Sequence, residues 1–286
     1  MSNQEKNKSA IVSPRGEKRS LVVLGGGESG VGAAILGKQK GFEVFVSDKG
    51  CIAKRYKEVL LQNNINFEEE KHTESKILRG HVIVKSPGIP DSIPLVLKLK
   101  ENGIPVISEI EFAAKHTTAT LVGITGSNGK TTTALLTQFI LKNAELNSGI
   151  AGNIGDSFAL QVATQSYENY VLELSSFQLD GIVDFNSHIA ILTNITPDHL
   201  DRYEDDFNKY IESKFRITKN QTASDYLIYD ADDEAINTWL QKNSTKANLI
   251  PFSLEKELEY GAFIKDDNII ININKETIQM PISTLS

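Results

Sequence analysis

The chain has 286 residues, of which 40% are hydrophobic and 23% charged, and its formal net charge is −7. This length suggests about two domains with buried cores, and the acidic balance offers no basic surface for nucleic acid or an anionic membrane. The one cysteine excludes an internal disulfide and a cysteine zinc cluster. Because no apolar run approaches a membrane span and no signal-type core is present, we expect a cytoplasmic protein.

The first patterned stretch, residues 21–32, reads L-V-V-L-G-G-G-E-S-G-V-G and predicts a strand that ends in a glycine turn. A helical run and a second strand follow, and lead to Asp48. Three glycines fit the pattern G-x-G-x-x-G: Gly25, Gly27 and Gly30. This pattern is typical of a dinucleotide site, where it gives a tight turn, close approach to a diphosphate, and an acid for a sugar or base. The alternative is a βαβ unit whose glycines serve only helix packing.

Strand-like and helix-like runs alternate further along, and S-P-G-I-P (residues 86–90) follows a predicted strand. Ligands of an open parallel sheet lie beyond the carboxyl ends of its strands, so this turn is a candidate ligand contact, the alternative being a proline turn without a ligand. The polar, lysine- and serine-rich residues 1–19 are predicted to be a disordered tail. We predict an α/β protein with a Rossmann-like parallel-sheet domain over residues 20–113 and a second domain over 114–286, with the boundary in the polar stretch 111–118.

The second domain begins with an apolar strand, residues 119–124, that stops at a glycine-rich turn and a helix. Glycines let backbone N–H groups turn toward one anion, the helix N-terminus adds its positive end, and a lysine adds a full charge. We therefore predict a P-loop-type ATP site made of Gly126, Ser127, Asn128, Gly129, Lys130, Thr131 and Thr132. The spacing differs from G-x-x-x-x-G-K-[ST], and the alternative is a glycine turn with a solvated lysine.

Two later strands end in polar residues that could join this loop. Glu173 is the one acid of the strand Y-V-L-E-L (170–174), where a Mg²⁺-holding carboxylate belongs, unless it caps the next turn. The strand 188–192 runs into T-N-I-T-P-D-H-L-D-R-Y (193–203), which places His199 and Asp198 beyond a strand end. We predict that His199 binds metal or phosphate, the alternative being an ordinary surface or core histidine.

A predicted helix over residues 205–218 places a lysine on an apolar stripe. Phe207, Tyr210 and Ile211 lie at helical spacing, and the next position of that stripe is Lys214. An inward lysine must snorkel to solvent, pair, or lose its charge, and periodicity alone favours snorkelling. The acidic run D-A-D-D at 230–233 is predicted to be a helix cap rather than a metal site.

These motifs resemble the Mur ligase family, which builds the peptide stem of bacterial peptidoglycan. The resemblance covers nearly all of residues 19–286 and rests on G-I-T-G-S-N-G-K-T-T, A-G-N-I-G, L-E-L-S-S-F-Q-L-D and N-I-T-P-D-H-L-D-R-Y followed by Lys214. It implies that ATP phosphorylates a carboxylate and that an amine then displaces phosphate from the acyl phosphate. The S-S-F-Q sequence resembles members that add D-glutamate to UDP-N-acetylmuramoyl-L-alanine and release ADP.

The resemblance also implies roles for particular residues. The catalytic group would be Lys130, Glu173, His199 and Lys214, with Thr131 and Glu173 on a first Mg²⁺ or Mn²⁺ and with His199 and Lys214 on a second metal. Asp198 would be a supporting neighbour. A lysine ammonium cannot bind a cation, but in this family the lysine is N-carboxylated and therefore anionic. The resemblance thus implies a metal-binding role that would explain why Lys214 lies on the inward stripe.

In this family the first domain holds UDP rather than NAD. Carried over, Ser29, Asp48, Ser86 and Gly88 would contact uridine or diphosphate, and Asn153 and His199 would lie near the substrate. Lys49 and Gly50 stand where family members often have a hydroxyl residue and an arginine, so how uracil is held is open.

Family members also continue into a C-terminal domain that supplies further ATP contacts and the D-glutamate site. We expect this domain to be absent, and the chain to be a monomer that turns over little. The alternatives are another Mur-type amino acid ligase, a nicotinamide-dependent oxidoreductase with a nucleotide-binding domain, and a binding module without catalysis.

Overall fold

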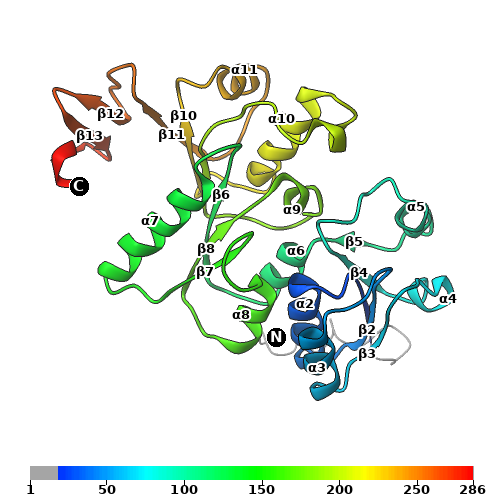
Figure 1. The fold of residues 1–286 in the computed structure, drawn as a ribbon. Helices are drawn as coiled ribbons and strands as arrows, with labels where there is room; N and C mark the ends of the chain where they lie inside the picture. Colours follow the sequence, from blue (N-terminus) through cyan, green and yellow to red (C-terminus); the bar gives the residue numbers. More distant parts are fainter. Residues whose placement is uncertain (1–18, 286) are drawn as a thin grey trace, which may run out of the picture. The chain divides into compact units, whose positions relative to one another are not determined.

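The computed structural model describes residues 19–285, so the predicted disordered tail lies outside the described residues except for Arg19. The predicted α/β class is confirmed: helices flank two sheets (Figure 1). The chain divides into two compact units, of which the first contains residues up to 119 together with 149–168 and 180–185, and the second contains the rest. The domain boundaries given above stay a prediction. Within residues 19–285, no helix is long and apolar enough to cross a membrane.

The sheet of the first unit is parallel and has the order β3-β2-β1-β4-β5. Its strands are β1 (Ser20–Leu24), β2 (Glu43–Ser47), β3 (Asn66–Glu68), β4 (Val82–Lys85) and β5 (Val106–Ile107). The helices of this unit are α2 (Glu28–Gln39), α3 (Lys54–Gln62), α4 (Glu74–Ile77), α5 (Pro94–Glu101), α6 (Glu109–Ala114) and α8 (Phe158–Thr164). The chain order reverses at β1, which is where such sheets bind ligands.

Buried aliphatic side chains join the strands of this sheet to its helices. Val22 and Leu24 of β1 form a cluster with Ile83 of β4 and with Leu95 and Leu99 of α5. Strands buried on both faces are expected to be continuously apolar, as β1 and β4 are.

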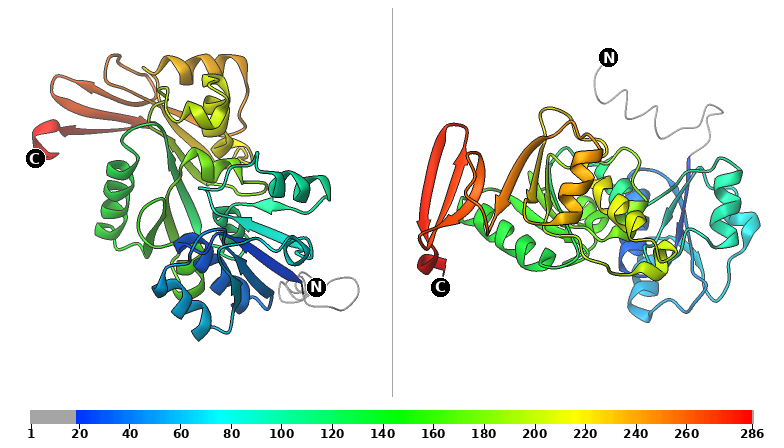
Figure 2. Two further views of the ribbon diagram at one scale, coloured as in Figure 1. Left: turned by 45° about the vertical axis from the view of Figure 1, so that its right-hand side comes forward. Right: turned by 90° about the horizontal axis from the view of Figure 1, so that it is seen from above.

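The larger sheet has the order β14-β13-β12-β11-β10-β9-β6-β8-β7. Its strands are β6 (Thr120–Thr125), β7 (Ser148–Gly152), β8 (Asn169–Glu173), β9 (Ile189–Leu192), β10 (Tyr226–Asp230), β11 (Asn248–Ser253), β12 (Gly261–Lys265), β13 (Asn268–Ile273) and β14 (Glu276–Pro281). The pairings from β12 to β8 are parallel, whereas β12, β13 and β14 pair in antiparallel hairpins at one end (Figure 2).

The remaining helices are α7 (Lys130–Asn143), α9 (Ser176–Asp180), η1 (Leu200–Tyr203), α10 (Phe207–Phe215), η2 (Arg216–Thr218), α11 (Glu234–Lys242) and η3 (Ile282–Leu285). The predicted helix over 205–218 is thus α10 followed by a 3₁₀ turn. The predicted cap role of the acidic run is confirmed at Asp233, whose side chain accepts from the N–H of Ile236.

Candidate nucleotide-binding sites

The glycine turn of the second unit connects β6, which ends at Thr125, to α7, which begins at Lys130. Gly126 has φ +146°, and a Cβ there would lie 2.0 Å from Thr193 Oγ1. Gly129 has φ +79° and caps α7. Both positions therefore require glycine. The strand, turn and helix predicted from the sequence are confirmed here, and the first amides of α7 border the loop, as an anion site requires.

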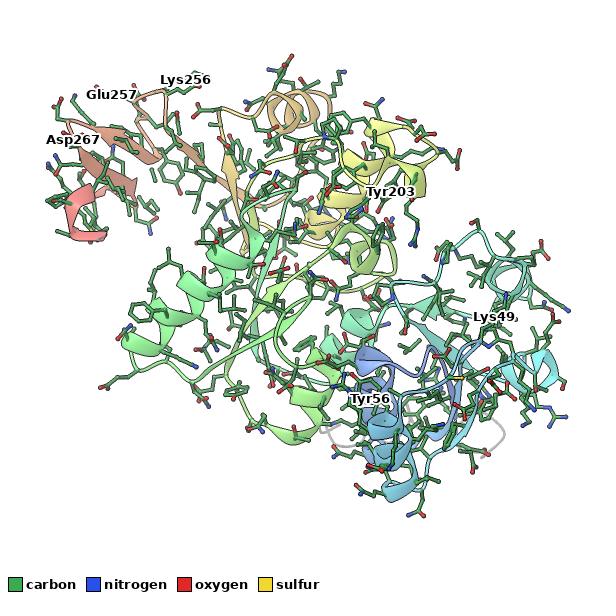
Figure 3. The ribbon with its side chains drawn as sticks, in the orientation of Figure 1. Lys49, Tyr56, Tyr203, Lys256, Glu257 and Asp267 are labelled. Atoms are coloured by element: carbon green, nitrogen blue, oxygen red, sulfur yellow. The ribbon has the colours of Figure 1, made fainter. Side chains whose placement is uncertain are left out.

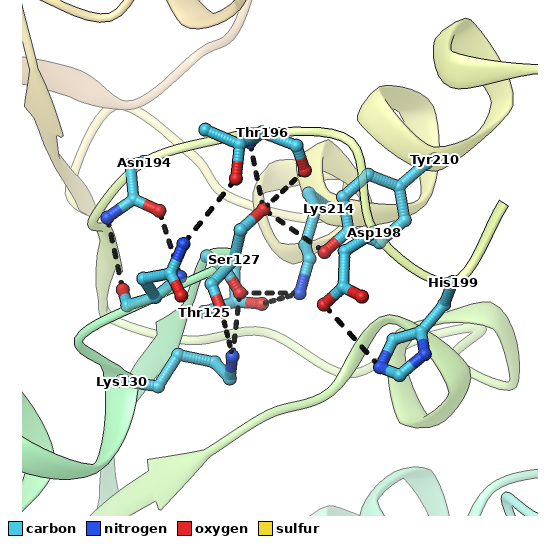
Figure 4. Close-up of polar contacts among 11 residues, drawn as sticks. Thr125, Ser127, Lys130, Asn194, Thr196, Asp198, His199, Tyr210 and Lys214 are labelled. Carbon is cyan, nitrogen blue, oxygen red and sulfur yellow. Dashed lines mark hydrogen bonds and ion pairs between the residues drawn. The ribbon is translucent and has the colours of Figure 1, made fainter.

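The segment after β9 holds this loop in place. Asn194 Oδ1 accepts from the N–H of Asn128 at 2.9 Å, and Asn194 Nδ2 donates to the carbonyl of Asn128 at 3.1 Å (Figure 4). Ser127 Oγ donates to Thr196 O at 2.8 Å. The sequence interpretation assigned no role to Asn194, although its place just after a strand beside β6 was a usable signal.

Three of the predicted phosphate and metal residues lie together. Lys130 Nζ donates to the carbonyls of Gly126 and Ser127 at 3.0 and 2.7 Å, so its ammonium lies against the loop. Thr131 Oγ1 donates to Oε2 of Glu173 at 2.7 Å, and Glu173 is 1% exposed. A hydroxyl and a carboxylate oxygen thus meet beside the positive end of α7. Thr132 lies in the first turn of α7 and is exposed.

Lys214 of α10 lies behind the loop and is only 2% exposed. Its Nζ donates to the carbonyl of Gly126 at 2.8 Å and to Thr125 Oγ1 at 3.3 Å. The inward stripe is confirmed, and the snorkelling alternative is wrong because the amine reaches the loop and not solvent. Burial raises the pKa of the neighbouring Tyr210, and the charge of Asp198 raises it further, whereas the hydrogen bond with Ser127 lowers it.

His199 precedes η1 in the left-handed conformation, with φ +51°. Its Nε2 lies 3.6 Å from Oδ2 of Asp198, its ring centroid lies 5.2 Å from that of Phe177, and its side chain is 56% exposed. Asp198 lies between His199 and Lys214 in Figure 4. Within residues 19–285, no group of three or more histidine, cysteine, aspartate or glutamate residues is suited to hold a metal ion. The metal role of His199 stays a prediction.

The first unit has a cavity of about 850 Å³ beyond the carboxyl ends of β1, β2 and β4. It gathers four of the predicted substrate residues: Ser29, Asp48, Ser86 and Gly88. Gly25 has φ +100°, and a Cβ there would lie 2.3 Å from Ser86 Oγ, whereas a Cβ at Gly27 would meet nothing within 4 Å. The first glycine lets the two loops approach, and the second leaves room for a ligand.

Asp48 is bound by two backbone amides. Its Oδ2 accepts from the N–H of Gly26 at 2.6 Å, and its Oδ1 accepts from the N–H of Gly50 at 2.8 Å. The carboxylate therefore ties the loop after β2 to the loop after β1. Asn153 lies between β7 and α8 and does not line this cavity.

The fold and the loop are those of an α/β protein with a P-loop-type domain. Residues 124–284 match the Mur ligase middle domain, and residues 18–93 match the MurD N-terminal domain. The chain belongs to the Mur ligase family.

Similar proteins with curated names support this assignment. A protein of Christiangramia forsetii named UDP-N-acetylmuramoylalanine–D-glutamate ligase is 57% identical over 94% of this chain and 60% of its own length. A protein of the same name from Bacteroides thetaiotaomicron is 53% identical over 88% of this chain and 57% of its own length. The chain thus spans about three fifths of the length of these relatives.

Solved structures share the fold. A UDP-N-acetylmuramate:L-alanyl-gamma-D-glutamyl-meso-diaminopimelate ligase of Neisseria meningitides has a TM-score of 0.61 and 18% identity, covering 91% of this chain and 85% of that one. A murein peptide ligase of Psychrobacter arcticus has a TM-score of 0.58 and 18% identity, and the match covers 92% of this chain and 61% of that one.

Proposed function

We propose that this chain provides the UDP-precursor site and the ATP phosphate site of an ATP-dependent ligase that joins D-glutamate to UDP-N-acetylmuramoyl-L-alanine and forms ADP. The reaction belongs to peptidoglycan synthesis and takes place in the cytoplasm. The contact between Thr131 and Glu173 beside Lys130 supports this most directly, because it places a hydroxyl, a carboxylate and an ammonium at one phosphate-binding loop. The names of the similar proteins support the choice of substrates.

The residues around this loop suit an anion together with a divalent cation. Backbone amides of the loop and the Lys130 ammonium would bind the phosphates, and Thr131 and Glu173 would hold Mg²⁺ or Mn²⁺ because hydroxyl and carboxylate oxygens are the ligands these ions prefer. When bound, such an ion neutralises charge that builds up on the transferred phosphoryl group. Lys130 would orient the γ-phosphate toward the alanine carboxylate, which takes the phosphoryl group and releases ADP. The amine of D-glutamate then attacks the acyl phosphate and displaces phosphate.

Lys214 would serve a second metal as its N-carboxylated form. Its neutral amine adds to CO₂ and releases one proton, which replaces a cation by a carbamate anion. Its burial beside the loop supports this role, since a charge is costly to bury and a carbamate would bind a cation together with His199. Asp198, 3.6 Å from His199, would orient the imidazole.

Calorimetric titration of the 286-residue chain tests the proposal. We expect UDP-N-acetylmuramoyl-L-alanine and Mg·ATP each to bind, and Lys130→Ala to abolish the binding of ATP but not of the UDP precursor. Lys142→Ala, an exposed site at the far end of α7, is the matched control and should bind both ligands as the wild type does. The proposed function would be refuted if the wild type failed to bind one or both of these ligands.

A further inference from the structure

Hydrogen bonds link Glu68 through Ser47 to His72, a residue that lines the cavity of the first unit. Ser47, the last residue of β2, is fully buried, and its Oγ lies 2.7 Å from His72 Nδ1 and 2.8 Å from Glu68 Oε1. Glu68 ends the adjacent strand β3, directly opposite Ser47 in the sheet. His72 follows on the loop to α4 and lines the cavity.

The direction of these hydrogen bonds follows from the carboxylate. Glu68 accepts from the N–H and the hydroxyl of Thr73, at 2.7 Å each, in addition to Ser47. Burial alone would raise the pKa of Glu68, but these hydrogen bonds and Lys76 hold it below its ordinary value. Glu68 is therefore ionised and can only accept. The single hydroxyl proton of Ser47 goes to the Glu68 carboxylate at 2.8 Å rather than to the carbonyl of Lys71 at 3.4 Å, so Ser47 Oγ accepts from His72 Nδ1–H.

This arrangement fixes the tautomer of the imidazole. Burial lowers the pKa of His72, and Lys49 lowers it further, although Asp48 and Glu68 pull the other way. The ring is neutral at pH 7, and with its proton on Nδ1 it has a lone pair on Nε2. Within the described part of the chain, the hydrogen bond of this ring is the one at Nδ1, so Nε2 is the atom available to a ligand.

We propose that Nε2 of His72 accepts a hydrogen bond from the N3–H of uracil and so selects a uridine nucleotide. This inference rests on the proposed function, because it assumes that the cavity binds the UDP part of the precursor. Uracil has a donor at N3, whereas cytosine has a lone pair there, which a lone pair on Nε2 would repel. A site built to pair with one hydrogen-bond donor rejects a ligand that lacks it more strongly than an apolar site could.

The carboxylates that line the cavity with His72 each have a partner within the protein: Asp48, Glu70, which accepts from Cys51 Sγ–H, and Glu74, which pairs with Lys98. Both oxygens of Asp48 already accept from backbone amides, at Gly26 and Gly50. Lys49, labelled in Figure 3 on the loop after β2, and Lys71 are donors only, so they suit phosphate or carbonyl oxygens and cannot accept from N3–H. His72 follows β3, the neighbour of β2 in the sheet, so its loop lies next to the one that carries Lys49 and Gly50.

Calorimetric titration of the full chain with three nucleotides tests this proposal: UDP, CDP, and UDP methylated at N3. We expect the wild type to bind UDP about tenfold or more tightly than either analogue, since each analogue removes the donor. In His72→Ala, UDP binding should weaken and the difference among the three should fall to about twofold. His81→Ala, whose ring contacts Ser20 outside the cavity, is the control and should discriminate as the wild type does.

The outcomes are distinct. If UDP binds but His72→Ala discriminates as the wild type does, His72 does not read the base, while the proposed function stands. If UDP does not bind the wild type, both fail. Nitrogen-15 NMR of the wild type, which needs no variant, should show the His72 proton on Nδ1, and a proton on Nε2 in the free protein would overturn the proposal.

Discussion

Thr131 Oγ1 lies 2.7 Å from Oε2 of Glu173, which joins the first turn of α7 to the end of β8. The two residues are 42 positions apart in the sequence, and the pairing of β6 with β8 brings them together. The order β9-β6-β8 sets the loop between two strand ends, so that polar side chains from three strands converge on one anion site.

Removing the carboxylate at this contact should weaken the binding of Mg·ATP far more than the binding of ATP without metal. We expect Glu173→Gln to raise the dissociation constant of Mg·ATP about tenfold or more, because a neutral amide holds a hard cation poorly. Thr137→Val is the control, since this hydroxyl donates to the carbonyl of Thr133 within α7. Titrations with and without Mg²⁺ check the prediction, and an equal loss in both would contradict it.

Local sequence signals were enough to predict the strand, glycine turn and helix in both units. Each turn needs glycine for a positive φ or a close approach, as at Gly25 and Gly126, and each follows an apolar strand. The inward position of Lys214 was predictable for the same reason, because a helical stripe is a local pattern. Strand β3 and helix α4 were missed because three or four residues are too few to show a period.

Two contacts between distant segments were not predicted. Glu111 begins the polar stretch that the sequence interpretation placed at a domain boundary, yet it lies in α6 and is fully buried. Its carboxylate accepts from the N–H groups of Val183, Asp184 and Phe185, more than 70 residues away. Nothing in the composition of 111–118 indicates such partners. Asn194 was overlooked likewise, because its partner Asn128 lies on another strand's loop.

Glu109 should make the protein less stable as the pH rises. Its Oε1 accepts from Ser157 Oγ at 2.7 Å and from the N–H of Ala159, but burial raises its pKa from 4.5 to about 7, and Glu28 adds to this. The folded state thus binds a proton that the unfolded state releases above pH 4.5. The stability this proton provides is fully present below pH 4.5 and is lost as the pH approaches 7, by about 3 kcal/mol.

Urea unfolding of the wild type and of Glu109→Gln at several pH values checks this. The amide keeps an acceptor for Ser157 and Ala159 but does not titrate. The unfolding free energy of Glu109→Gln minus that of the wild type should therefore rise from pH 4.5 to 7. A difference that stays constant over this range would show that Glu109 does not titrate there. Glu101→Gln, at the exposed end of α5, should leave the wild-type profile unchanged.

His116 should make the protein less stable as the pH falls, which is the opposite of the effect of Glu109. Burial, with the charges of Lys40 and Lys115, lowers its pKa from 6.5 to about 4. The unfolded state therefore binds a proton that the folded state rejects, and stability falls as the pH drops from 6.5 to 4. His116→Phe should remove this loss, because phenylalanine keeps the edge contact with Phe112 at 4.9 Å and cannot titrate. Phe42→Leu keeps the histidine and should keep the acid sensitivity. Equal acid profiles for wild type and His116→Phe would refute the assignment.

Lys214 should bind CO₂ reversibly if the proposed carbamate forms. We expect a carbamate resonance in ¹³C NMR when the chain is incubated with labelled bicarbonate and Mg²⁺, and we expect it to vanish in Lys214→Arg, because a guanidinium is a poor nucleophile and stays charged. Lys209→Arg, on the same helix but paired with Glu204 at the surface, should keep the resonance. A signal that persists in Lys214→Arg would place the modification elsewhere.

Two substitutions of Asn194 separate the effect of its hydrogen bonds on ATP binding from the effect of a charge placed at the same position. Its amide grips Asn128 through both a donor and an acceptor, while Thr193 Oγ1 donates to the same Asn128 carbonyl at 2.7 Å. Asn194→Ala should therefore weaken ATP binding only about threefold, since Thr193 and the backbone bond from Ser127 N to Asn194 O still hold the turn. Asn194→Asp keeps the acceptor but sets a negative charge against a carbonyl oxygen and the incoming phosphates, so its loss should be about tenfold or more and should shrink as salt is added. Titrations with ATP at low and high ionic strength compare the two. Weaker ATP binding by Asn194→Ala than by Asn194→Asp would contradict the prediction. It would mean that the loop depends on the acceptor of Asn194, and that the phosphates lie too far away for a charge at this position to affect binding.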